Sequence, residues 1–87
     1  MLPRVIDARH AGGHRVWLRF ADGLTGEIDL SNELWGGVFE PLKDPTEFAK
    51  LRVDPALDTI VWPTGADLSP QWLHDQIKAQ TKSAAAE

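Results

Sequence analysis

Apolar and polar residues alternate near the N-terminus with the period of two that is typical of β-strands. The pattern is clearest at residues 14–20. One face of this stretch consists of Val16, Leu18 and Phe20, and the other of Arg15, Trp17 and Arg19. Residues 4–10 and 24–30 are similar stretches, and short Gly-containing turns separate the three. This arrangement predicts a three-stranded antiparallel meander.

The length of each turn decides which residues face each other. A two-residue turn at Asp22-Gly23 would pair Phe20 with Thr25 and mix the two faces. A three-residue loop that ends at a left-handed Gly23 pairs Phe20 with Leu24 instead, and we expect this loop.

The same reasoning applied to the loop at residues 11–13 pairs Ala8 with Val16 and Ile6 with Leu18. On the polar face this register places Asp7, Trp17 and Glu27 side by side, with Arg15 opposite Asp29.

Helix-start signals dominate the rest of the chain. Residues 44–51 read as a short capped helix, 52–55 and 57–62 as strands, and 70–80 as a helix with Ser69 as its N-cap. The pattern therefore predicts an α+β fold: the meander is extended by one or two further strands, and helices pack on one of its faces. We expect a single domain over residues 1–80 and a flexible tail over 81–87.

Composition narrows the function classes. The 87 residues carry 9 Lys or Arg and 13 Asp or Glu, a net charge of −4, which disfavours direct nucleic-acid binding because phosphate contacts need clustered cations. Without Cys, the chain offers neither a thiolate metal site nor a thiol nucleophile. No apolar run is long enough for a membrane span or a signal peptide, so we expect a cytoplasmic protein.

Two segments, FADGLTGEIDL and WPTGADLSPQWL, carry a family resemblance. Together they resemble domain-of-unknown-function family 2442, a group of small prokaryotic proteins. The matching positions are Phe20, Asp22, Gly23, Asp29, Leu30, Trp62, Gly65, Ala66, Asp67, Leu68 and Pro70. The resemblance implies an α+β fold with a meander followed by helices and further strands. It implies no catalytic residues, because the family has no established activity. Some relatives are joined to a helix-turn-helix domain, and others look like antitoxin-type partners of a small protein.

The second segment reads as a connector that leads into the last helix. Its family-motif residues are Trp62, Gly65, Asp67 and Pro70. We expect a structural role for them, with Asp67 bonding loop amides or favouring the helix N-terminus.

The polar face of the meander is the candidate partner-binding surface. Its residues are Trp17, Arg15, Arg19, Asp7 and Glu27. Trp and Arg are enriched among interface anchors, so this face is a candidate for binding a protein. The alternative is that the chain's own helices cover Trp17, or that Arg15 or Arg19 stacks on it. A second aromatic segment, ELWGGVF, is expected to pack Trp35 and Phe39 into the core rather than to form a flap.

Catalytic and metal sites are not expected. His10 and His14 flank the first loop as neighbours, but a divalent metal usually takes three or four protein ligands. A Ser69–His74–Asp67 triad can be drawn, yet no nucleophile-elbow pattern supports it and Ser69 already serves as a cap. We therefore expect no enzyme activity, no cofactor and no metal.

The sequence predicts a small protein–protein interaction module that restrains a partner, with the antitoxin role implied by the resemblance alone. An acidic module suits a basic partner. Self-association as a homodimer is the other expected contact, and neither nucleic acid nor membrane is expected to bind directly. The alternative function is a sensor or regulatory module of a DNA-bound assembly. Its DNA-binding part would be absent, since no segment after Gln80 is long enough to supply it.

Overall fold

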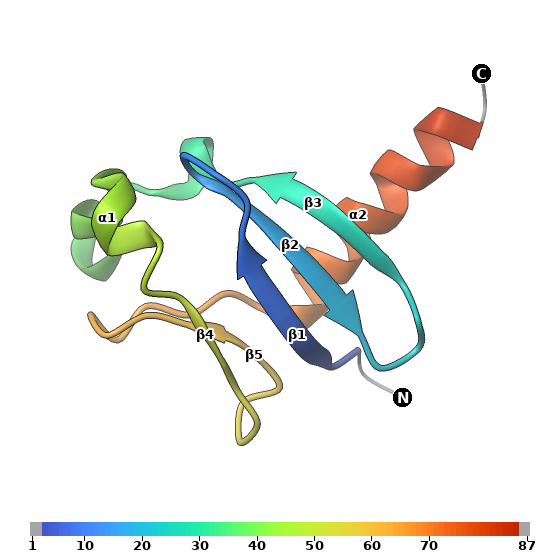
Figure 1. The fold of residues 1–87 in the computed structure, drawn as a ribbon, viewed down its shortest axis with the longest axis horizontal. Helices are drawn as coiled ribbons and strands as arrows, with labels where there is room; N and C mark the ends of the chain where they lie inside the picture. Colours follow the sequence, from blue (N-terminus) through green and yellow to red (C-terminus); the bar gives the residue numbers. More distant parts are fainter. Residues whose placement is uncertain (1–2, 86–87) are drawn as a thin grey trace.

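The computed structural model describes residues 3–85 of the chain, with side chains described through Gln80. The chain has the α+β fold that the sequence predicts, with three strands followed by short helices, two more strands and a long helix (Figure 1). In chain order the elements are β1 (Val5–His10), β2 (Arg15–Phe20), β3 (Thr25–Asp29), the 3₁₀ helices η1 (Ser31–Glu33) and η2 (Gly37–Lys43), α1 (Pro45–Phe48), β4 (Arg52–Asp54), β5 (Thr59–Val61) and α2 (Pro70–Ala85).

The meander is confirmed as a three-stranded antiparallel sheet in the order β1-β2-β3. The two further strands pair with each other in a separate two-stranded sheet, β4-β5, beside β1 (Figure 1). The backbone N–H of Val5 in β1 donates to the carbonyl of Asp58 at 2.9 Å and so ties the two sheets together. The second sheet thus lies next to the meander without continuing its ladder.

The predicted register between β2 and β3 is confirmed. Leu18 lies opposite Gly26, and the N–H of Phe20 donates to the carbonyl of Leu24 at 2.8 Å. Gly23 closes the loop with a φ of +94°, a backbone conformation that residues with a Cβ rarely adopt. The alternation excluded a shift by one residue, which would have turned apolar side chains into water, and the three-residue loop ending at Gly23 then determined this pairing.

The predicted register between β1 and β2 is wrong by two positions along β2. Ala8 lies opposite Leu18 rather than Val16. The strands begin to pair at Ala11, whose N–H donates to the carbonyl of Arg15 at 3.0 Å. The loop therefore consists of residues 12–14 and not 11–13. Since a shift of two preserves the alternation, the hydrophobic pattern alone could not distinguish the two registers.

A β-bulge near the start of β1 changes which side chain enters the core. The register shifts between Val5 and Asp7. Val5 is buried at 2 % exposure, whereas Ile6 is 48 % exposed. The pairing of Ile6 with Leu18 that we expected is wrong, because the shift of two positions places Ala8 opposite Leu18. The bulge then inserts one extra residue, so that Val5 and not Ile6 lies opposite Phe20 and turns inward.

Helix α2 covers the inner face of the meander, behind the sheet in Figure 1. Leu73 and Ile77, four residues apart, point from α2 into the core. Ser69 is confirmed as the cap: its hydroxyl oxygen accepts the N–H of Trp72 at 3.2 Å. The helix continues to Ala85, past the predicted end at Gln80. The flexible tail expected at residues 81–87 remains a prediction, and residues 86–87 lie outside the described part.

Of the two aromatic residues that we expected in the core, one packs against it and the other is exposed. Phe39 packs partly buried against the core, but Trp35 is 71 % exposed, so its predicted burial is wrong. The preceding residue, Leu34, takes the inward position at 1 % exposure. Two successive residues with positive φ, Gly36 and Gly37, then turn the chain directly after Trp35.

Candidate functional site

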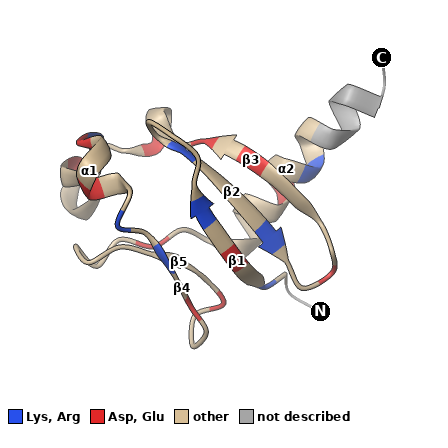
Figure 2. Cartoon of the chain, in the orientation of Figure 1, with Lys and Arg blue, Asp and Glu red and all other residues tan. Residues whose placement is uncertain are grey.

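The outer face of the meander is the side of the sheet opposite α2, and it faces the reader in Figure 1. Its side chains are Asp7, Arg9, Arg15, Trp17, Arg19, Thr25, Glu27 and Asp29. Figure 2 shows that the charges on β2 are basic and those on β3 acidic. Trp17 lies on the middle strand of this face and is half-buried.

Arg9, which the sequence places on the outer face but not against Trp17, is the cation that contacts this side chain. Its guanidinium carbon lies 5.5 Å from the centroid of the indole ring, within cation–π range. We had expected Asp7 beside Trp17, and Arg15 or Arg19 was the stacking residue only in the alternative interpretation. The corrected register instead places Arg9 opposite Trp17 and Asp7 opposite Arg19. Only the true length of the first loop could have revealed this contact.

The other charges of the outer face form exposed pairs. Arg15 Nε lies 3.2 Å from Glu27 Oε1 across the strands, and Arg9 lies 3.7 Å from Asp7. Within the part of the chain that the structure describes, Arg19 has no ion pair. Exposed pairs contribute about 0–1 kcal/mol each, so they order the face more than they stabilise the fold.

His10 and His14 each have a structural contact of their own. A ring nitrogen of His10 bonds the carbonyl oxygen of Gly13 at 2.9 Å, and one of His14 bonds that of Lys43 at 2.8 Å. Both rings meet Phe48 edge-on, with centroids 5.8 and 5.3 Å away. Because the pairing starts at Ala11, these histidines are not directly opposite each other as we expected. They attach the first hairpin to α1.

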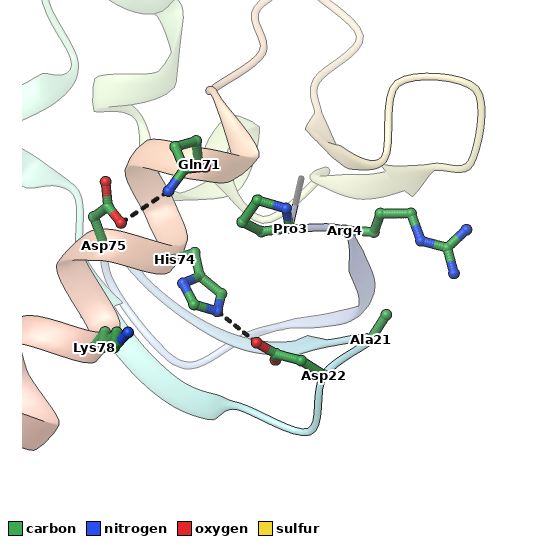
Figure 3. A pocket seen from close by; sticks show the side chains of 8 residues that line it. All are labelled: Pro3, Arg4, Ala21, Asp22, Gln71, His74, Asp75 and Lys78. Carbon is green, nitrogen blue, oxygen red and sulfur yellow. Dashed lines mark hydrogen bonds and ion pairs between the residues drawn. The ribbon is translucent and has the colours of Figure 1, made fainter. Parts of the chain in front are cut away.

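A surface cavity of about 460 Å³ lies where the β2–β3 loop meets α2 (Figure 3). It is lined by Pro3, Arg4, Ala21, Asp22, Gln71, His74, Asp75 and Lys78. His74 bonds Asp22 across it, with Nε2 2.8 Å from Oδ2. The imidazole also stacks edge-on against Phe20 at 4.9 Å. This pair joins residues distant in the sequence, and no local pattern could have predicted it.

The triad drawn from the sequence is not assembled. His74 bonds Asp22 and not Asp67, and the Ser69 hydroxyl accepts a hydrogen bond from the helix backbone. Within the described residues, Asp22 and His74 form a carboxylate–imidazole pair without a nucleophile. The pair orients the imidazole ring and attaches the β2–β3 loop to α2.

Acid should weaken this contact. The N–H of Leu24, followed by His74, lowers the pKa of Asp22 below its ordinary value near 3.8. Since the folded-state pKa lies below the unfolded one, the carboxylate stabilises the fold above about pH 4, and the contribution is lost as the pH falls through the folded-state pKa. We expect Asp22→Asn to flatten the loss of stability below that pH, measured by urea unfolding at several pH values.

Asp67→Asn is the matched control, because no hydrogen bond or ion pair holds the Asp67 side chain in the described residues. An equal flattening in both variants would contradict a specific role for Asp22.

The family-motif loop is a tight connection between β5 and α2. Trp62 is buried at 2 % exposure, and its indole N–H donates to the carbonyl of Phe48 at 2.8 Å. Gly65 has a φ of +92° and donates its N–H to the carbonyl of Trp62. Asp67 pairs through its backbone with Val61. Its side chain is exposed and bonds no loop amide in the described residues, so the hydrogen bonds that we expected from this carboxylate are not present. Pro70 is the first residue of α2. Each backbone or buried group therefore has a structural contact.

Comparison with known proteins agrees with the motifs. Residues 5–79 match the family described as "Protein of unknown function (DUF2442)", and the chain belongs to this family. No curated protein and no solved structure matches the chain. In the described residues, no helix combines the length and apolarity that crossing a membrane requires.

Proposed function

We propose that this protein is a small non-enzymatic module that binds another protein through the outer face of its meander. The observation that carries the proposal is Trp17. This large aromatic side chain lies on the middle strand, on the face that α2 leaves uncovered, and Arg9 stacks on it at 5.5 Å. Trp and Arg are the residue types most enriched at the energetic centres of interfaces.

The charge of the chain favours a basic partner. The net charge is −4, and Glu27 and Asp29 lie on the outer side of β3. Complementary charge speeds association and disfavours wrong partners. The net charge and the acidic side chains of β3 therefore support a cytoplasmic role in which the protein restrains a small basic partner, as an antitoxin does. The antitoxin role itself rests on the family resemblance.

The test compares the half-buried Trp17 with the exposed Trp35. The partner is first isolated on the wild-type protein from a lysate of the organism that encodes it, and then titrated as a purified protein. We expect Trp17→Ala to weaken the binding free energy of the partner by about 2 kcal/mol, which raises Kd about thirtyfold. Trp35→Ala is the matched control, because Trp35 is exposed but lies outside the outer face.

An unchanged Kd for Trp17→Ala, in a variant whose circular dichroism matches the wild type, would overturn the proposed surface. An equal loss in both variants would point to nonspecific hydrophobic contact and would also contradict it.

A further inference from the structure

The backbone of β3 has one side with no neighbouring strand, because β3 ends the three-stranded sheet. The N–H of Phe20 donates to Leu24, and the N–H of Leu30 to His14. In an antiparallel pair, the residues bonded to the neighbour recur at every second position. The backbone N–H and C=O groups that point toward β2 are therefore those of Leu24, Gly26, Ile28 and Leu30. It follows that Thr25, Glu27 and Asp29 direct their N–H and C=O groups away from the sheet.

The opposite edge of the meander is blocked. On β1, the N–H of Ala8 is bonded by the Asp7 carboxylate at 2.9 Å. The N–H of Val5 is taken by Asp58 in the turn between β4 and β5. No hydrogen bond within residues 3–80 uses the N–H of Thr25, Glu27 or Asp29. The open edge of β3 also has no Pro or Lys, two devices by which natural edge strands avoid pairing.

The side chains beside this edge select the partner's charge. A strand added to β3 would place one residue beside Glu27 and another beside Asp29, both on the outer face. On the side toward β2, Glu27 already lies 3.2 Å from Arg15, which is directly opposite Asp29. A cation on the open side of β3 would therefore give these acidic side chains a basic neighbour on both sides. We propose that β3 is a docking edge for an extended segment of a basic partner, with Lys or Arg at every second position.

The residues between those cations would face the core side of the sheet. Ile28, which is 4 % exposed, lies on that side of β3. Helix α2 crosses behind β3, and its C-terminal part extends past the strand (Figure 1). A fourth strand would therefore lie partly over this helix, which favours apolar side chains at the alternate positions.

A second copy of this chain fits the edge less well. In the antiparallel register that overlaps all of β3, Glu27 would lie opposite Glu27 of the other copy. Like charges directly opposite each other destabilise a strand pair. Each copy also carries a net charge of −4, so the two would repel each other.

The inference rests on the proposed function, since it names the chemistry of the protein partner, but its test is independent. The probe is the peptide acetyl-Lys-Val-Lys-Val-Lys-amide, followed by the amide signals and hydrogen exchange of the ¹⁵N-labelled full chain. We expect exchange at Thr25, Glu27 and Asp29 to slow about tenfold at saturation. The control peptide acetyl-Lys-Lys-Lys-Val-Val-amide has the same charge without the alternation, and we expect no such slowing.

Two variants sharpen the result. Thr25→Pro removes one outward N–H and leaves the ladder to β2 intact, so it should abolish peptide binding. Thr25→Val keeps that N–H and is the matched control. If Thr25→Pro does not fold, Glu27→Lys still tests the docking edge. This substitution should weaken binding of the Lys peptide and strengthen binding of acetyl-Glu-Val-Glu-Val-Glu-amide.

Equal binding of both Lys peptides, or peptide-induced changes centred away from β3, would overturn the docking edge. If light scattering shows a dimer of the wild type that Thr25→Pro does not form, the occupant of the edge is a second copy of this chain, and the proposed basic segment is overturned. If Trp17→Ala loses the isolated partner while the peptide leaves β3 unprotected, the edge is wrong and the proposed function stands. Protection of β3 with no effect of Trp17→Ala would support the docking edge and contradict the proposed outer-face surface.

Discussion

Phe48→Ala should lower the free energy of unfolding by about 3–5 kcal/mol, the usual cost of deleting a buried phenylalanine side chain. Phe48 has no exposed surface. Its ring contacts His10 and His14 of the first hairpin and lies 5.6 Å from the Trp62 ring. The substitution therefore opens a cavity where three segments of the chain pack against this side chain.

The measurement is urea unfolding followed by Trp fluorescence. A domain of this size has a total stability of only about 5–10 kcal/mol, so Phe48→Ala should remove a large share of it and move the urea midpoint to a much lower concentration. Phe39→Ala is the matched control, since Phe39 is only partly buried and should cost clearly less. A loss below about 1 kcal/mol for Phe48→Ala would show that the three segments do not depend on this ring.

Gly26→Ala should be destabilising by about 1–3 kcal/mol, although Ala normally suits a strand better than Gly. A Cβ at Gly26 would lie 2.7 Å from Cγ2 of Ile77 in α2. That methyl group is attached to a branched carbon of a side chain only 1 % exposed, so it cannot swing away. The missing side chain of Gly26 is thus what allows α2 to lie close to β3.

A double-mutant cycle measures this contact directly. Ile77→Ala removes the opposing methyl group, so Gly26→Ala should cost less in that background than in the wild type. Thr25→Ala, an exposed substitution on the same strand, controls for the effect of Ala in β3. If Gly26→Ala costs the same in both backgrounds, close packing of α2 is not the reason for the glycine.

The local features of the fold were predictable because each depends on a few neighbouring residues. The alternation at Val16, Leu18 and Phe20 correctly predicted which face of β2 is buried. Asp44 caps α1 by accepting the N–H of Thr46, as its position before Pro45 indicated. The errors arose where two strand registers agree equally well with the alternation of apolar and polar residues. The register of β1 shifted by two, and that shift altered which residue stacks on Trp17.

The candidate sites depend on contacts between distant residues. All five residues predicted for the outer face do lie on it, because alternation alone decides the face. Their partners within that face were predicted only in part: Arg15 opposite Asp29 is confirmed, whereas Asp7 beside Trp17 is wrong. The Asp22–His74 pair gave no signal in the sequence, since a hydrogen bond between a turn and a helix leaves no periodic trace.

By itself, the sequence determined the family, the α+β class and the polar outer face, because motifs, caps and alternation are properties of short stretches of chain. The tertiary structure decided which residues meet: Arg9 on Trp17, Asp22 on His74 and Ile77 on Gly26. It also decided which strand edge stays open, since β1 is blocked by Asp7 and by Asp58 of a distant turn while β3 is not. These outcomes depend on loop length and on packing between elements, which residue types at short spacing do not encode.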